Sequence, residues 1–166
     1  MCEHDPHWAA AFAHEAVAIR LALAEPRLVI HHIGSTSVPG LIAKPVIDML
    51  LETRWLDDLD ERTATLEQIG YVARGEYGIA GRRYFVKNGA DGRRSHHLHA
   101  FMVGSAQITR YLSFRDCLIR SPLARRDYAA VKLAASRNGR DKEAYQSGKA
   151  HYIHRLLGEL SCPSTE

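Results

Sequence analysis

The chain has 166 residues, of which 46% are hydrophobic and 25% charged, and this composition predicts one folded domain over residues 1–166. A net charge of +3 is too small to indicate a nucleic-acid partner, and no apolar run reaches the roughly 18 residues of a membrane helix, so we expect neither partner. Three scattered cysteines and an N-terminus without a signal-peptide pattern predict a cytoplasmic protein that lacks a disulfide framework.

Helical and strand patterns alternate along the chain and then give way to helices alone. The order predicts an α+β fold, in which flanking helices cover a small mixed β-sheet and a helical C-terminal part follows. The predicted elements are a helix at 8–24, strands at 28–33 and 46–51, a helix at 56–69, a hairpin with strands at 71–78 and 82–87, a strand at 95–103, and helices at 108–121, 123–135 and 141–160.

The stretch from 28 to 52 predicts two buried strands joined by a tight polar turn. The turn begins at Gly34-Ser35, where glycine lets the backbone approach a ligand and successive amides can cradle a phosphate, although an ordinary tight turn has the same pattern. Asp48 is the one charge inside the second strand, and a carboxylate in such a run is costly unless it is paired or binds a cation. We therefore expect Asp48 to lie beside the turn and to face a cleft.

A longer motif contains both features, since residues 32–50 read HIGSTSVPGLIAKPVIDML. This motif resembles the signature of the GrpB family of bacterial proteins, and the resemblance extends over nearly the whole chain. It implies a nucleotidyltransferase-like fold. In some bacteria a similar domain is fused behind dephospho-coenzyme A kinase, which implies a partner enzyme of coenzyme A metabolism. The further matching segments are GRRYF at 81–85, HHLH at 96–99, FRD at 114–116, Tyr128, Lys132, Tyr145 and Lys149.

The nucleotidyltransferase-like fold implies Mg²⁺ on Asp48, next to a phosphate turn made by Gly34, Ser35 and Thr36. This sequence departs from the superfamily pattern, which places two carboxylates two residues apart, because Leu50 occupies the second position. Glu52 faces the same way, but it lies roughly 13 Å along the strand and cannot share an ion with Asp48. The stretch therefore supports the scaffold better than a two-metal transfer reaction.

His97 and His99 are the second group of candidate site residues. Period-two alternation puts them on one side of their strand, roughly 6.6 Å apart, and predicts that His96 faces solvent. If this strand neighbours the Asp48 strand, the two histidines and Asp48 could bind a divalent transition metal, contact a phosphate, or act as acid and base. The structural alternative is a pair of partly buried, hydrogen-bonded histidines.

Cations on apolar helix stripes are the third signal. Arg115 and Lys149 each fall among leucines, isoleucines and tyrosines at helical spacing, so each requires an anionic partner. Asp116 is a poor partner for Arg115 unless the arginine bends back, because adjacent helix residues point about 100° apart. The remaining partners are Asp48, a carboxylate from another helix, or a bound anion. We expect Arg115, Lys132 and Lys149 to bind an anionic ligand, joined by Lys44 and Arg82.

These patterns predict a protein that binds a nucleotide or a phosphate ester. The predicted catalytic residues are Asp48, His97 and His99, and the reaction would be a Mg²⁺-dependent nucleotidyl transfer with an incomplete carboxylate set. Two alternatives stay open at this point. One is a hydrolase in which these three residues hold a single metal ion, and the other is a non-catalytic domain that assists a partner enzyme.

Overall fold

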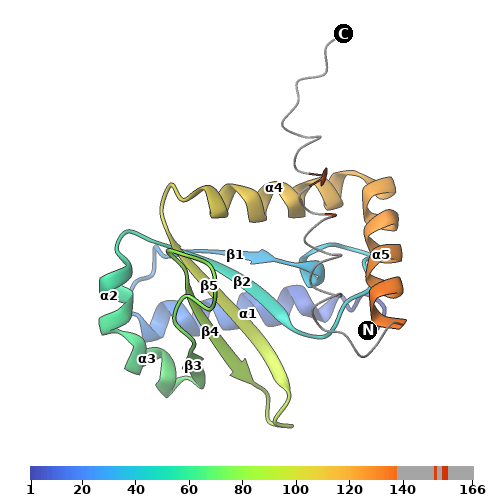
Figure 1. Cartoon of the computed structure of the whole chain (residues 1–166). Coiled ribbons are helices and arrows are strands. Elements are labelled where there is room, and N and C mark those ends of the chain that lie inside the picture. The colour runs from blue at the N-terminus through green and yellow to red at the C-terminus, as the bar shows by residue number, and fades with distance from the viewer. Residues whose placement is uncertain (138–151, 153–154, 157–166) are drawn as a thin grey trace. The chain divides into compact units, whose positions relative to one another are not determined.

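The computed structural model describes residues 1–137, 152 and 155–156 (Figure 1). The chain divides into two compact units, Met1–Tyr111 and Leu112–Glu166. The predicted helix at 141–160 lies largely outside the described residues. The elements of the described part are α1 (His7–Ala22), β1 (Val29–Ile33), the short 3₁₀ helix η1 (Ser35–Ser37), β2 (Ile47–Thr53), α2 (Leu56–Glu61), α3 (Thr63–Gln68), β3 (Tyr71–Ala73), β4 (Arg83–Asn88), β5 (Arg94–Met102), α4 (Ala106–Arg120) and α5 (Pro122–Arg137).

A five-stranded mixed sheet in the order β1-β2-β5-β4-β3 forms the centre of the first unit, which confirms the predicted fold class. β2 and β5 pair in parallel, and the other neighbouring strands pair antiparallel. The parallel register sets Asp48 opposite His97 and Leu50 opposite His99. Residues that are distant in sequence therefore share one face of two adjacent central strands.

The two faces of the sheet have different characters, because successive side chains of a strand point to opposite sides. Met49 and Leu51 of β2 and Leu98 of β5 belong to the hydrophobic core, together with Ala16 and Ile19 of α1. Figure 1 shows α1 running along the sheet. Asp48 lies one residue out of step with the core positions, and it therefore projects from the opposite face.

The predicted helix at 56–69 is broken into α2 and α3. The break falls at Arg62, whose backbone leaves the helical region (φ −93°, ψ 9°). The guanidinium of Arg62 donates a hydrogen bond to the carbonyl oxygen of Leu23 (2.9 Å) and so anchors the break to the end of α1. This contact is long-range and leaves no local pattern in the sequence.

The predicted strand at 71–78 is also shorter in the structure, where β3 ends at Ala73. Tyr77, Gly75, Gly78 and Gly81 all have positive φ angles, which an extended strand cannot accommodate. The hairpin therefore closes through a wide loop between β3 and β4. Arg82 lies in this loop and not on the predicted strand.

The second unit contains the later part of α4 and all of α5. Its described core is aromatic: the ring of Tyr128 packs edge-on against Phe114 (centroids 5.1 Å apart) and stacks on Tyr152 (5.4 Å). The hydroxyl of Tyr152 donates a hydrogen bond to the carbonyl oxygen of Ala124 (3.0 Å). Across the described ranges, none of the helices combines the length and apolar character that crossing a bilayer requires.

Candidate functional site

The turn after β1 is built around Gly34, which has φ 71°. A β-carbon at this position would lie 2.9 Å from the β-carbon of Asp48 and closer still to one carboxylate oxygen. The position therefore requires glycine for two reasons, the left-handed backbone and the approach of Asp48. The turn is closed by hydrogen bonds from the amide and the hydroxyl of Ser37 to the carbonyl oxygen of Gly34 (3.3 and 2.6 Å).

Thr36 has a structural role in this turn. Its hydroxyl is buried, donates to the carbonyl oxygen of Val46 (3.4 Å) and lies 3.0 Å from Nε2 of His32. The ring of His32 stacks on Phe12 of α1 (4.8 Å). Thr36 thus ties the turn to the start of β2 and to α1.

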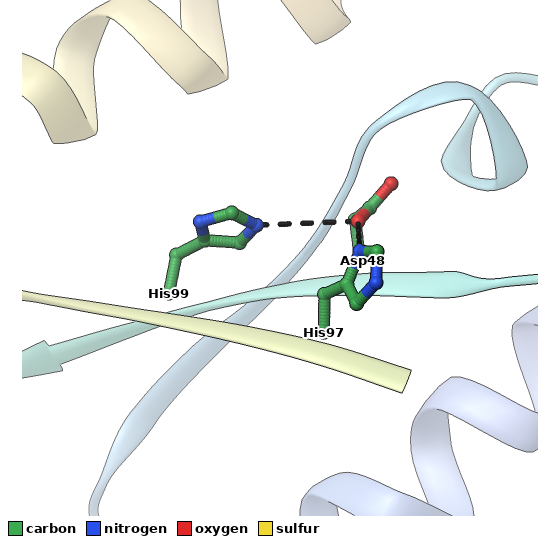
Figure 2. Close-up of side chains that lie close together, drawn as sticks. All are labelled: Asp48, His97 and His99. Carbon is green, nitrogen blue, oxygen red and sulfur yellow. Dashed lines mark hydrogen bonds and ion pairs between the residues drawn. The ribbon is translucent and has the colours of Figure 1, made fainter. Parts of the chain in front are cut away.

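Asp48, His97 and His99 converge beside this turn (Figure 2). Nδ1 of His97 lies 2.9 Å from Oδ1 of Asp48, and Nε2 of His99 lies 4.0 Å from the same oxygen. One ligand atom from each residue falls within 4.8 Å of the others, which is close enough for a shared metal ion. The Asp48 side chain is 31% exposed, so part of it is accessible to a ligand.

The charge of the Asp48 carboxylate is stabilised by its neighbours. Burial alone would raise the pKa of Asp48, but the hydrogen bond from His97, together with the positive charges of His99 and His97 when protonated, lowers the pKa well below its ordinary value. The pKa of His99 is also lowered, first by burial and then by the charge of Arg82, against the opposing pull of Asp48. At neutral pH the site therefore holds an ionised Asp48 next to a neutral His99.

Arg82 is 5% exposed and contacts the Nδ1 side of the His99 ring. Its Nη1 donates to Nδ1 of His99 (3.3 Å), and its other groups donate to the carbonyl oxygens of Glu76 (3.1 Å) and Tyr77 (2.7 Å). The guanidinium also lies over the ring of Tyr84 (4.8 Å). The hairpin arginine predicted to bind ligand thus contacts a site histidine and not the solvent.

Two tyrosines near the histidines were not among the predicted site residues. The ring of Tyr84 lies 5.6 Å from that of His97 and 5.0 Å from that of His99, and the ring of Tyr111 lies 5.5 Å from His99. Burial and the nearby charge of Asp48 raise the pKa of Tyr84. Period-two alternation in the GRRYF segment could have indicated Tyr84, but Tyr111 required the tertiary structure.

His96 differs from its prediction. It points to the opposite face from His97, but that face is covered, and Nε2 of His96 is buried without a hydrogen-bond partner among the described residues. Burial and the charge of Lys87 lower the pKa of His96, against an opposing effect of Glu15 on α1. The prediction of solvent exposure was wrong because alternation fixes the face of a strand and not what packs on that face.

The predicted cations of the helical part are only partly described. Nε of Arg115 donates to Oδ1 of Asp116 (2.7 Å), so Arg115 does pair with its neighbour, the exception that the prediction allowed for an arginine that bends back. Lys132 is buried, with Nζ 5.6 Å from the ring centre of Tyr128, and Lys44 is exposed. Lys149 lies outside the described residues. For all four cations, ligand binding stays a prediction.

The GrpB protein family model matches residues 1–159. The chain belongs to the GrpB family. It is 38% identical over 151 residues to the UPF0157 protein YqkA of Bacillus subtilis and 46% identical over 157 residues to the UPF0157 protein PA4798 of Pseudomonas aeruginosa. These matches cover 90% and 93% of this chain, which spans only 43% and 64% of the two relatives.

Solved structures agree with the family and with the fold. The crystal structure of the conserved protein GrpB from Enterococcus faecalis matches with a TM-score of 0.79 and 34% identity, over 93% of this chain and 98% of that chain. The Cid1 poly(U) polymerase with bound MgGTP matches with a TM-score of 0.50 and 12% identity, over 79% of this chain and 45% of that chain. The fold of this GrpB protein is therefore nucleotidyltransferase-like.

A further relative is a dephospho-CoA kinase of Mycolicibacterium paratuberculosis. It is 30% identical over 169 residues, and the match covers 87% of this chain and 42% of the kinase. The chain is thus similar to a part of that enzyme.

Proposed function

We propose that this GrpB protein binds a nucleotide or another phosphorylated small molecule beside the Gly34 turn, with one divalent cation on Asp48. The observation that carries the proposal is the convergence of Asp48, His97 and His99 next to this turn, with ligand atoms within 4.8 Å of one another. The nucleotidyltransferase-like fold supports it, as does the ligand MgGTP in the structure of the poly(U) polymerase. A cation at Asp48 would neutralise the repulsion between this carboxylate and a phosphate.

The donor set favours certain metals. An ionised carboxylate next to imidazole nitrogens suits Mn²⁺, Fe²⁺ or Zn²⁺, whereas Mg²⁺ prefers oxygen ligands and would take most of them from the phosphates and from water. Asp48 is ionised at neutral pH because its pKa is lowered. We therefore expect transition metals to bind by themselves and Mg²⁺ to bind mainly together with a nucleotide.

The same geometry argues against the two-metal transfer reaction. That reaction needs two ions about 4 Å apart and several carboxylates to hold them. Leu50 is 0% exposed and packs at the position of the second carboxylate. Oε1 of Glu52 lies 2.6 Å from Nε2 of His31. The Glu52 carboxylate therefore interacts with His31 and does not join Asp48 in binding an ion.

A second candidate function is a hydrolase in which Asp48, His97 and His99 hold one metal ion that activates water. The 4.8 Å grouping of the three ligand atoms favours it. The third function predicted from the sequence, assistance to a partner enzyme of coenzyme A metabolism, is supported by the similarity to part of a dephospho-CoA kinase. The first two functions require a bound metal ion and the third does not, so metal-binding experiments distinguish them.

The test compares the wild-type protein with Asp48→Asn, which keeps the shape of the side chain and removes its charge. Thermal unfolding is measured with Mn²⁺, Zn²⁺ or Mg²⁺, each alone and with ATP. Saturating the wild type at about 100 times the dissociation constant should add about 2.7 kcal/mol to its stability, and Asp48→Asn should lose this response. The control is Asp57→Asn, an exposed carboxylate of α2. Equal responses of wild type and Asp48→Asn, or no response of either, would refute the proposal.

A further inference from the structure

Arg82 has a buried guanidinium, and each of its three nitrogens donates a hydrogen bond. Two are directed at main-chain carbonyl oxygens of the loop before β4, those of Glu76 and Tyr77, and the third at Nδ1 of His99 on β5. The ring of Tyr84 covers one face of the group. The position of Arg82 relative to His99 is therefore set by the loop and the sheet together.

This contact decides which nitrogen of His99 carries the hydrogen. Arginine has only donors, so Nδ1 of His99 must offer its lone pair to Arg82. A neutral imidazole has one N–H, which then resides on Nε2. Nε2 points toward Oδ1 of Asp48, but the separation of 4.0 Å is longer than a hydrogen bond. His99 thus presents an N–H to the site without donating it to Asp48.

An N–H on Nε2 conflicts with metal ligation at that atom, because an imidazole binds a metal through a lone pair. Freeing Nε2 would move the hydrogen to Nδ1, where it would face the Nη1–H of Arg82 across 3.3 Å. Both residues are buried, so neither donor could turn to solvent. In His97 the assignment is the reverse: Nδ1 lies 2.9 Å from the ionised Asp48 carboxylate, which can only accept, so the hydrogen is on Nδ1 and the lone pair is on Nε2. The His97 side chain is 27% exposed.

We infer that Arg82 is a positioning residue that holds His99 as a hydrogen-bond donor to an anionic oxygen of the ligand, and that Asp48 and His97 alone are the protein ligands of the cation. The position of the hydrogen on Nε2 of His99 is inferred from the contact with Arg82. The roles of Asp48, His97 and His99 toward a cation and a phosphate rest on the proposed function. A phosphate bridging the cation would present one oxygen to the metal and another to Nε2–H of His99. The three-ligand hydrolase site is thereby disfavoured.

The hydrogen is located by nitrogen NMR of the imidazole rings in uniformly ¹⁵N-labelled wild-type protein at neutral pH, with His99→Gln to assign the resonances. The expected result for His99 is an unprotonated Nδ1 and a protonated Nε2. A hydrogen on Nδ1, or on both nitrogens, would overturn the inference. This measurement needs neither a metal nor a ligand, so its outcome is independent of the proposed function.

The roles are tested by binding Co²⁺ alone, and then pyrophosphate in the presence of Co²⁺, to wild type, His97→Gln and His99→Gln. Glutamine keeps an N–H donor but is a poor ligand for Co²⁺. We expect His97→Gln to weaken Co²⁺ binding about tenfold or more, and His99→Gln to change it less than about threefold. Equal losses of Co²⁺ affinity in the two variants would overturn the assignment of the ligands. Absence of Co²⁺ binding to wild type would refute the proposed function as well.

Arg82→Met supplies a complementary readout. Removing the donor frees His99 to exchange its hydrogen, so Co²⁺ affinity should rise while pyrophosphate affinity falls. Tighter binding is a result that simple loss of structure cannot produce. Unchanged Co²⁺ affinity in a folded Arg82→Met would contradict the inference, and if this variant does not fold, the NMR result and the two histidine variants decide.

Discussion

At the scale of single residues, the site depends on how closely Gly34 and Asp48 pack. Any side chain at Gly34 would occupy space that the Asp48 carboxylate fills, and the backbone there has φ 71°. Gly40 has a similar φ of 74°, but a β-carbon at that position would meet nothing within 4 Å. Substitution of Gly40 therefore measures the cost of backbone strain alone, and substitution of Gly34 measures the cost of strain plus steric overlap with Asp48.

We expect Gly34→Ala to destabilise the protein by about 2–4 kcal/mol and Gly40→Ala by about 1 kcal/mol, because both add left-handed strain and only the first adds a clash. Urea unfolding of both variants measures the difference. Gly34→Ala should also lose the response to metal. Equal destabilisation by the two substitutions would show that Asp48 can move away at little cost.

Tyr71 gives the protein a predictable weakness at high pH. Burial, and after it the charge of Glu15, raises the pKa of Tyr71 far above its ordinary value. The folded state therefore keeps the Tyr71 proton above about pH 10, where the unfolded chain releases it, so stability is lost as the pH rises through this range. Tyr71→Phe should move the alkaline unfolding midpoint to higher pH. Tyr77→Phe, at a side chain that is 66% exposed, is the control and should leave the midpoint unchanged.

At the scale of elements, a partly buried ion pair joins α1 to the sheet. Nζ of Lys87 on β4 lies 2.8 and 3.0 Å from the two carboxylate oxygens of Glu15. Glu15 is buried on the apolar face of α1, where an unpaired carboxylate would be costly. The pair therefore fixes how α1 lies against this end of β4.

We expect Lys87→Met to cost about 3 kcal/mol, since it leaves the Glu15 carboxylate without its partner, and Glu15→Met to cost less, because the Lys87 side chain reaches partly into solvent. The double variant should recover part of the loss. Urea unfolding of the four proteins gives the coupling energy. Asp60→Ala, which breaks an exposed pair with Arg83, is the control, with an expected cost below about 1 kcal/mol. Additive effects of the two methionine substitutions would contradict a coupled pair.

At the scale of the whole molecule, the chain consists of two units with separate cores. The first unit contains every residue of the Asp48 site, including Arg82, His99 and Tyr111. The second unit has an aromatic core around Tyr128 and carries Arg115 and Lys132, two of the predicted anion-binding cations. Metal binding is therefore expected to depend on the first unit alone.

Anion binding by the second unit is tested with Arg115→Met, which keeps much of the stem packing and removes the charge. We expect this variant to bind Co²⁺ like the wild type, because the metal site belongs to the first unit, and to bind inorganic phosphate more weakly, because a charge predicted to hold an anion is removed. Its stability without ligand should change by less than about 1 kcal/mol, because the pair with Asp116 is partly exposed. Arg126→Met is the control, since Arg126 is 77% exposed and lies near Asp127. Undiminished phosphate binding would remove Arg115 from the predicted anion-binding residues.

Local physics of the chain determined much of the candidate site from the sequence alone. A glycine turn after an apolar strand, a lone carboxylate in the next strand and period-two alternation in HHLH were enough to put Asp48, His97 and His99 on defined faces of their own strands. The mixed sheet also followed from the order of the elements. These features depend on backbone sterics and side-chain direction, which act over a few residues.

Only the tertiary structure decided which faces meet and which are covered. The parallel pairing of β2 with β5 brings together residues 49 positions apart, and the pairing register, not a local pattern, sets Asp48 opposite His97. The contact of Arg82 with His99 depends on a loop whose glycines leave the strand conformation, and the burial of His96 depends on what packs over its face of the sheet. Such contacts join segments distant in sequence, and their geometry follows from the packing of the whole core, so no short stretch of sequence contains it.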